Sequence, residues 1–187
     1  ADGICDYTND LGGLATLNDG YEPTESHDTS HGAWHNWNNR YENGVAKNAW
    51  VSYTWDKPVE INSMDIYYFS DHGGIVAPKS ASFEYLNDAG EWVVADEAQG
   101  LACVEDEYNT VKLANIKTKA IRMTMEPEFM NDGDPAHGVG VIEWKVYGKY
   151  AEDKPETVDK TALDAVIREA ESRAEKDYTS DSWETFA

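Results

Sequence analysis

A hydrophobic period of two residues, repeated in short runs between turn-forming clusters, limits how this chain can fold more than any other feature. Met64, Ile66 and Tyr68 fall on one face of the run 63–70, and the residues between them fall on the other, as in a β-strand. Similar runs cover residues 50–55, 81–86, 91–95, 110–113, 120–126 and 141–147. Gly, Asn, Asp and Pro separate these runs, and helical periodicity is absent as far as residue 148, so we expect an all-β chain.

The segment Asn87-Asp88-Ala89-Gly90 supplies residues that tolerate the left-handed backbone of a hairpin turn. It therefore predicts that runs 81–86 and 91–95 are antiparallel neighbours. With the other short strands, this predicts a jelly-roll β-sandwich over residues 1–150.

The chain changes character after residue 150. Residues 151–158 are rich in Glu, Asp, Lys and Pro and predict a linker. In residues 160–176, Leu163, Val166, Ile167 and Ala170 recur at helical steps, which predicts a short C-terminal amphipathic helix. One helix cannot bury such a stripe, so we expect residues 159–187 to be the first part of a helical module.

The chain is strongly acidic, with 15 basic and 36 acidic residues and a net charge of -21. Such a charge repels nucleic acid and anionic membrane surfaces. No apolar run approaches the roughly 18 residues of a membrane span. The acidity fits an exported, solvated surface, divalent cation binding or a neutral ligand.

Two cysteines, Cys5 and Cys103, match neither a CxxC motif nor zinc-ligand spacing. A disulfide and two isolated thiols remain equally open from the sequence.

Five segments in a fixed order resemble a known family, namely 17–24 (LNDGYEPT), 34–37 (WHNW), 50–53 (WVSY), 78–80 (PKS) and 142–148 (IEWKVYG). They are similar to the discoidin or coagulation factor V/VIII C-type family, and within it to carbohydrate-binding module family 32 and related modules of bacterial arabinan-degrading glycosidases. The resemblance spans roughly residues 1–150 and implies a galactose-binding-domain-like fold. In the tail, residues 159–163, 178–179 and 182–183 resemble the start of a FIVAR repeat.

The resemblance also implies a structural calcium ion between the first long loop and the last strand. Ca²⁺ prefers six to eight oxygen ligands, mixing carboxylates with carbonyls. The matching positions are Asp19 and Glu143 for side-chain oxygens, Thr24 for a hydroxyl or carbonyl, and Tyr21 for its carbonyl. Tyr21 stands where the family has a second acid, and Glu22 is displaced by one position. The alternative is an ordinary Asp-Gly turn beside a solvated glutamate.

A neutral sugar needs an aromatic surface and hydrogen-bonding groups on loops held by strands. Two regions offer them, residues 34–41 and the pair of segments 69–72 and 129–137. The predicted ligand-binding residues are Trp34, His35, Trp37, Arg40, Asp71, His72, Asn131 and His137. Trp34 and Trp37 are equally compatible with core anchors, and Asp71 and His72 with a turn. The strand positions of Trp50, Trp55, Trp92 and Trp144 predict core residues.

These observations predict a monomeric, non-catalytic carbohydrate-binding module, secreted or attached to the cell surface, from a bacterial multimodular glycoside hydrolase. Arabinose- or galactose-containing glycans are the ligands that the resemblance implies. A surface adhesion or protein-interaction module is the alternative. A glycosidase is a weaker one, because neither a nucleophile elbow nor a defined pair of catalytic carboxylates stands out.

Overall fold

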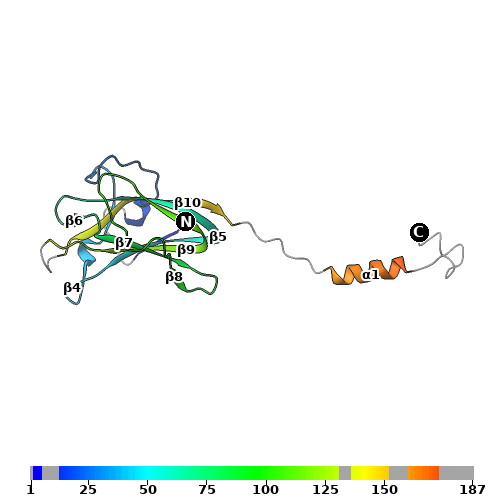
Figure 1. Cartoon of the computed structure of the whole chain (residues 1–187). Helices are drawn as coiled ribbons and strands as arrows, with labels where there is room; N and C mark the ends of the chain where they lie inside the picture. The colour runs from blue at the N-terminus through cyan, green and yellow to red at the C-terminus, as the bar shows by residue number, and fades with distance from the viewer. Residues whose placement is uncertain (1, 6–12, 131–135, 152–159, 173–187) are drawn as a thin grey trace. The chain divides into compact units, whose positions relative to one another are not determined.

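The computed structural model describes residues 2–5, 13–130, 136–151 and 160–172 (Figure 1). It divides into two compact units, residues 1–151 and 152–187. None of the helices in the described segments is long and apolar enough to cross a membrane.

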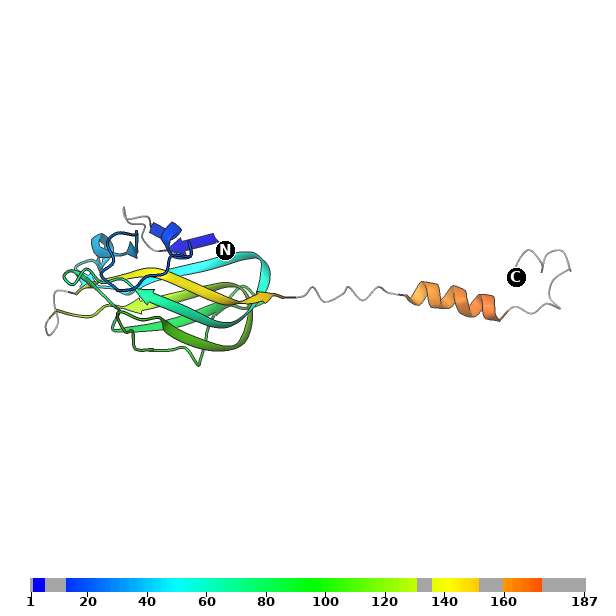
Figure 2. The ribbon, with the colours of Figure 1, turned by 90° about the horizontal axis from the view of Figure 1, so that it is seen from above.

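The first unit is built almost entirely from antiparallel strands. Its elements are β1 (Asp2–Cys5), η1 (Gly13–Thr16), β2 (Trp34–His35), η2 (Trp37–Asn39), β3 (Tyr41–Glu42), β4 (Val45–Ala46), β5 (Ala49–Tyr68), β6 (Ile75–Val76), β7 (Ser80–Leu86), β8 (Trp92–Val94), β9 (Asn109–Glu126) and β10 (Gly138–Tyr150). The main path is β2-β10-β5-β9-β7-β8, with β1 paired to β5 and β6 paired to β10. This is the all-β jelly-roll sandwich that the sequence predicts (Figure 2).

Two long strands, β5 and β9, run through both layers of the sandwich and pair with each other in each layer. Residues 49–54 of β5 pair with 120–125 of β9, and residues 59–66 of β5 pair with 109–118 of β9. The prediction of separate strands at 50–55 and 63–70, and at 110–113 and 120–126, is therefore wrong, because each pair is one bent strand. The polar residues between the runs form the bend from one layer to the other.

The predicted hairpin is confirmed. Leu86 of β7 pairs with Trp92 of β8, and Gly90 has a φ of 81° in the turn between them. The side-chain oxygen of Asn87 accepts hydrogen bonds from the backbone N–H groups of Ala89 and Glu91, which fixes the turn.

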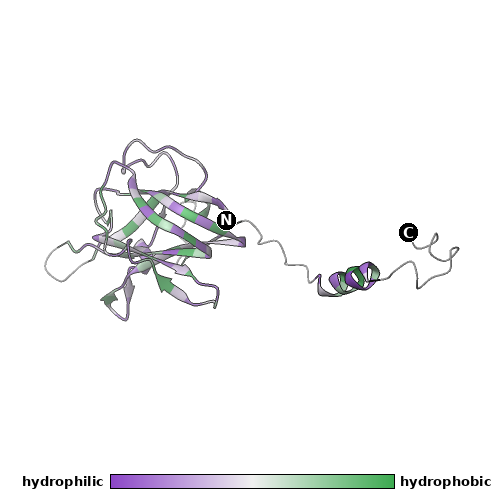
Figure 3. Ribbon diagram, turned by 45° about the vertical axis from the view of Figure 1, so that its right-hand side comes forward, coloured by the Kyte–Doolittle hydropathy of each residue, from purple (hydrophilic) through white to green (hydrophobic). Residues whose placement is uncertain are grey.

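The main core lies between the two layers, where green hydrophobic positions alternate with purple polar ones along the strands (Figure 3). Tyr53 stacks on Trp144 with 4.4 Å between ring centroids, and both side chains are buried together with Phe83. The prediction that Trp144 is a core residue is confirmed.

The outer face of the β10 and β5 layer is also buried, because the loop that follows η1 covers it. Tyr67, Phe69 and Ile142 form a second cluster there, against which Tyr21 packs. This loop therefore covers the outer face of β10 and β5.

The described part of the second unit is one helix, α1 (Thr161–Glu171), within the predicted range 160–176. All of its residues are exposed. The predicted linker and most of the FIVAR-like tail lie outside the described residues. In the first unit, Cys5 and Cys103 are not joined by a disulfide.

Candidate functional site

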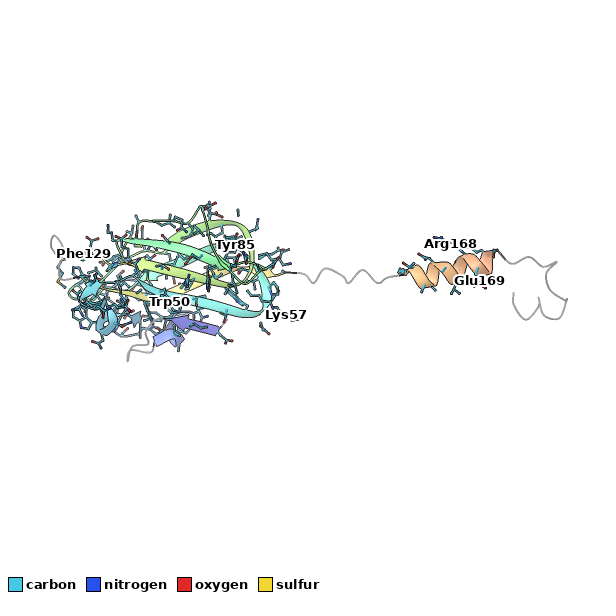
Figure 4. All side chains as sticks on the ribbon, turned by 90° about the horizontal axis from the view of Figure 1, so that it is seen from below. Trp50, Lys57, Tyr85, Phe129, Arg168 and Glu169 are labelled. Atoms are coloured by element: carbon cyan, nitrogen blue, oxygen red, sulfur yellow. The ribbon has the colours of Figure 1, made fainter. Side chains whose placement is uncertain are left out.

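One end of the sandwich brings together most of the residues predicted to bind sugar, and we call it the loop site. It contains His27, Trp37, Arg40, Asp71, His72 and His137. Phe129 marks this end, and Lys57 lies at the other (Figure 4).

Trp37 and Arg40 form a fixed pair in the loop site. The guanidinium carbon of Arg40 lies 3.6 Å from the centroid of the Trp37 ring. Arg40 Nη1 donates to the Trp37 carbonyl at 2.7 Å, and Nε donates to the Ala136 carbonyl at 3.2 Å. Arg40 therefore joins the η2 segment to the start of β10 and covers the Trp37 ring. We assign it as a positioning residue rather than a freely available sugar ligand.

Two imidazole rings stack beside this pair. His27 and His72 have parallel rings with centroids 4.5 Å apart, and His27 Nδ1 lies 3.2 Å from the Ser70 carbonyl oxygen. His72 is exposed and has a φ of 53°, in the left-handed region that non-glycine residues seldom adopt. Strain held at an exposed loop residue of this kind is typical of functional sites.

Asp71 shapes the turn between the stacked imidazoles and the pair formed by Trp37 and Arg40. Its Oδ1 accepts hydrogen bonds from the backbone N–H groups of Gly73 and Ile75, both at 2.8 Å. Both bonds are accepted by one carboxylate oxygen, Oδ1. The structure therefore shows the turn role that the sequence left open, and the binding role of Asp71 stays a prediction.

Two buried polar atoms at this end have no hydrogen-bond partner among the described residues, His137 Nδ1 and Asn36 Nδ2. Such atoms are costly unless water or a ligand satisfies them. Asn36 Oδ1 meanwhile accepts from the Val139 N–H at 2.9 Å, which anchors the WHNW segment to β10. Asn131, also predicted to bind sugar, lies outside the described residues.

Two predicted sugar ligands are placed elsewhere. Trp34 is 0% exposed in the main core, so the structure supports the core-anchor alternative and contradicts a role as a stacking surface. His35 is 8% exposed, and its Nδ1 accepts the Trp37 N–H at 3.3 Å. His35 therefore supports the Trp37 backbone from within instead of facing the surface.

The predicted calcium region lies on β10, where Glu143 is only 2% exposed. Among the described residues, its Oε2 atom finds no hydrogen-bond partner. Burial, and secondly the negative charge of Asp19, raise the pKa of Glu143 to about 7. A buried carboxylate with one unsatisfied oxygen, next to a second carboxylate, is suited to a cation, which would relieve both the burial cost and the repulsion.

The loop residues of this region are already partly engaged. Asp19 Oδ2 lies 3.0 Å from His31 Nε2, and Asp19 Oδ1 accepts the Tyr21 N–H at 3.0 Å. The Tyr21 ring stacks on His31 and its hydroxyl donates to Asp28, so Tyr21 would contribute only its carbonyl oxygen. Thr24 is exposed.

Glu22, the acid that is displaced by one position from the second acidic position of the family, is bonded to other side chains. Its carboxylate accepts from Lys145 Nζ at 2.5 Å and from the Tyr108 hydroxyl at 3.0 Å. These bonds, that from Lys145 first, lower the pKa of Glu22.

An open hollow of about 420 Å³ borders Glu143, Gly20 and Tyr53. Within the described ranges, no three His, Cys, Asp or Glu side chains converge as a metal-binding group. A cation at Glu143 would therefore need carbonyl, hydroxyl or water oxygens as well, which suits Ca²⁺ better than a transition metal.

The geometry of Gly74 gives a stability prediction. A Cβ atom at Gly74 would lie 2.5 Å from the Trp37 ring, whereas one at Gly73 would lie 3.4 Å from Asp71. Gly74→Ala is therefore expected to lower the unfolding free energy by about 1–3 kcal/mol, because the Trp37 ring, which is held in contact with Arg40, must shift. Urea unfolding of this variant, with Gly73→Ala as the matched control, measures the difference; equal stability of the two would contradict the contact.

Sequence reasoning missed His27 and Gly74 as parts of the loop site. Neither has a local pattern that marks it, because His27 meets His72 from a separate loop and Gly74 matters only through Trp37. The aromatic content of residues 34–41 did signal the region, but could not show which rings are buried.

No family model matches the chain. Solved structures of similar fold include a structure of the Streptococcus pneumoniae beta-galactosidase BgaA, with a TM-score of 0.60, 19% identity and coverage of 79% of this chain and 91% of that one. A family 32 carbohydrate-binding module of Clostridium perfringens NanJ, in complex with galactose, matches with a TM-score of 0.54, 14% identity and coverage of 78% and 91%. An F5/8 type C domain from Bacteroides fragilis matches with a TM-score of 0.56, 18% identity and coverage of 80% and 92%.

The fold also matches one segment of a longer chain. It covers 28% of a Bacteroides thetaiotaomicron chain whose name refers to alpha-L-fucosidase, with a TM-score of 0.55 and 16% identity. At these identities the likeness establishes the fold alone. The fold expected from the sequence motifs, that of family 32 modules and F5/8 type C domains, is thereby confirmed.

Proposed function

We propose that residues 1–151 form a non-catalytic carbohydrate-binding module whose loop site binds a neutral, arabinose- or galactose-containing glycan. The observation that carries the proposal is the convergence at the loop site of stacked imidazoles, a carboxylate oxygen and unsatisfied buried donors or acceptors. Such groups match the hydroxyls and C–H faces of a sugar. The fold, shared with a module solved with galactose, supports this assignment.

The surroundings favour an uncharged ligand. The chain carries a net charge of -21, and Asp71 lies within the loop site. A uronic-acid polymer would be repelled, whereas a neutral sugar would meet no such barrier. We further propose that the chain acts outside the cell as the targeting module of a larger glycoside hydrolase, where it would hold the enzyme near its substrate.

We also propose that Ca²⁺ binds between the 18–24 loop and β10. Glu143 and Asp19 would supply carboxylate oxygens, and Tyr21 and Thr24 would complete the shell with carbonyl or hydroxyl oxygens. The unpartnered Glu143 Oε2 supports this set. The ion would tie the loop to the last strand and so stabilise the fold.

Isothermal titration with galactose- and arabinose-containing oligosaccharides tests the loop site. His72→Ala is expected to weaken binding about ten-fold with little change in thermal midpoint, because His72 is exposed and its loss leaves the core intact. Lys57→Ala, at the opposite end of the sandwich, is the control and should bind as wild type does. If His72→Ala and wild type bind with equal affinity, the loop site is not the binding surface.

A further inference from the structure

Two tryptophans, Trp50 and Trp92, and the ion pair of Glu84 and Arg122 lie together on the solvent face of the layer that contains β7, β8 and the paired halves of β5 and β9. We call these four residues the indole strip. Figure 4 is seen from the side of this layer. Arg122 of β9 pairs directly with Ser52 of β5 and with Glu84 of β7, so their side chains share one face.

The two indoles lean towards the same guanidinium group. The Arg122 guanidinium carbon lies 5.9 Å from the Trp50 ring centroid and 4.3 Å from the Trp92 ring centroid, so the rings are at most 10.2 Å apart. The strands that carry them, β5 and β8, are separated by β9 and β7, about 14 Å at ordinary strand spacing. The side chains therefore converge above the sheet.

This arrangement contradicts the prediction that Trp50 and Trp92 are core residues. Trp92 is 37% exposed, its neighbour Val94 is 46% exposed, and Trp50 is half-buried. Their strand pattern resembled that of Trp144, but they point away from the core. Large apolar rings that are exposed next to one another indicate a contact surface, whereas single exposed apolar residues are common on any protein.

The charges within the strip cancel. Arg122 Nε and Nη2 both donate to Glu84 Oε2, at 3.0 Å and 2.6 Å. This geometry leaves Arg122 Nη1 and Glu84 Oε1 as a donor and an acceptor beside the indoles. In a chain with a net charge of -21, the strip is a neutral region.

Hydroxyl groups border the strip beside Trp50, whereas two apolar side chains, Leu86 and Val94, border it beside Trp92, because Leu86 pairs with Trp92 and Val94 pairs with Glu84. Trp50 pairs with Thr124, which pairs in turn with Ser82, and Ser80 of β7 lies on the same face. A stable protein interface would need an apolar centre within roughly 800 Å² per partner. Two indoles with Leu86 and Val94 on one side, and an ion pair and hydroxyl groups on the other, do not supply such a centre. Flat rings, hydroxyls and a closed ion pair match an uncharged polyol.

We propose that the indole strip is a second glycan-contact surface, which binds neighbouring sugar rings of one extended, uncharged polysaccharide chain. The inference rests on the proposed carbohydrate-binding function but not on the loop site. Short sugars bind at the loop site, and long chains gain additional affinity by contact with the strip or by engaging both surfaces.

The test compares long and short ligands with the intact chain. Affinity electrophoresis in gels containing β-1,4-galactan or debranched arabinan measures polysaccharide binding, and calorimetry with galactose and arabinose measures the loop site. Trp92→Ala is expected to weaken polysaccharide binding about ten-fold and to leave monosaccharide affinity unchanged. Trp92→Tyr should retain part of the polysaccharide affinity. Tyr150→Ala, which removes an aromatic ring with 61% exposure elsewhere, is the matched control.

The outcomes separate the two proposals. If Trp92→Ala keeps its fold, by near-ultraviolet circular dichroism, and binds both polysaccharides as wild type does, the strip proposal is overturned while the loop site stands. If wild type binds no glycan of either length, the proposed function and the strip proposal fall together. If sedimentation shows that wild type self-associates and Trp92→Ala does not, the strip is a protein interface and the glycan proposal is wrong.

Discussion

Without divalent cations, the sandwich is expected to lose about 2–3 kcal/mol of unfolding free energy between pH 5 and pH 8 through Glu143 alone. Burial and the charge of Asp19 raise the pKa of this carboxyl from 4.5 to about 7 in the folded chain. Between these two values the folded state holds a proton that the unfolded state has released. Stability therefore falls as pH rises through this window, and levels off above pH 7.

Other carboxyl groups have lowered pKa values in the folded chain, so they make stability fall as pH decreases rather than as it rises. Hydrogen bonds, chiefly from Ser30 to Asp28 and from Lys79 to Glu126, lower the pKa values of these acids. Their contributions are lost as pH falls below the unfolded values near 4, outside the window of Glu143. Urea unfolding at a series of pH values, in chelator and in Ca²⁺, separates the two effects.

Glu143→Gln identifies the residue responsible. In chelator at pH 8 this variant is expected to be more stable than wild type, because the buried negative charge is gone. Ca²⁺ should stabilise wild type by about 2.7 kcal/mol at one hundred times its dissociation constant and should stabilise the variant much less. Glu22→Gln is the control, since Glu22 is exposed and bonded to Lys145. A calcium effect of equal size in wild type and Glu143→Gln would contradict the proposed site.

The fold could be predicted because its signals are local. The alternation at Met64, Ile66 and Tyr68 and the turn at Asn87 depend only on nearby residues, and both are confirmed. What the sequence could not show is that neighbouring runs join into single bent strands. Continuity through Pro58 depends on how β5 and β9 cross between layers, which is a property of the whole sandwich.

The site was predicted at the level of segments rather than of side chains. Residues 34–41 and 69–72 do meet at one end, but Trp34 is core and Arg40 is committed to carbonyl oxygens. Residue type indicates which groups a side chain can bind. Packing determines whether its donors and acceptors are already bonded within the protein. For the same reason, the exposure of Trp92 was hidden by a strand pattern that it shares with Trp144.

Gly148→Ala is expected to lower the unfolding free energy by about 3 kcal/mol, the upper end of the range that is typical when a side chain is added at a closely packed position. Gly148 follows an irregularity in the pairing of β10 with β5, and a Cβ atom there would lie 2.1 Å from the Glu60 carbonyl oxygen. That oxygen belongs to the backbone of β5, so relief requires one strand to shift, and both strands are tied into the core. Gly3→Ala, where the new methyl group would meet Leu14 at 3.4 Å, is the matched strand control and should be nearly neutral.

The Ala151 N–H, just after β10, donates a hydrogen bond to the Pro58 carbonyl oxygen at 2.9 Å. The end of β10 therefore lies near Lys57, at the opposite end of the sandwich from Phe129 (Figure 4). Gly148→Ala should therefore lower the urea midpoint while glycan affinity, measured well below the unfolding transition, stays at the wild-type value. A variant as stable as Gly3→Ala would show that the register of β10 differs from the one described. Loss of affinity in a fully folded Gly148→Ala protein would instead show that the two ends of the sandwich are coupled, because no contact of Gly148 reaches the loop site among the described residues.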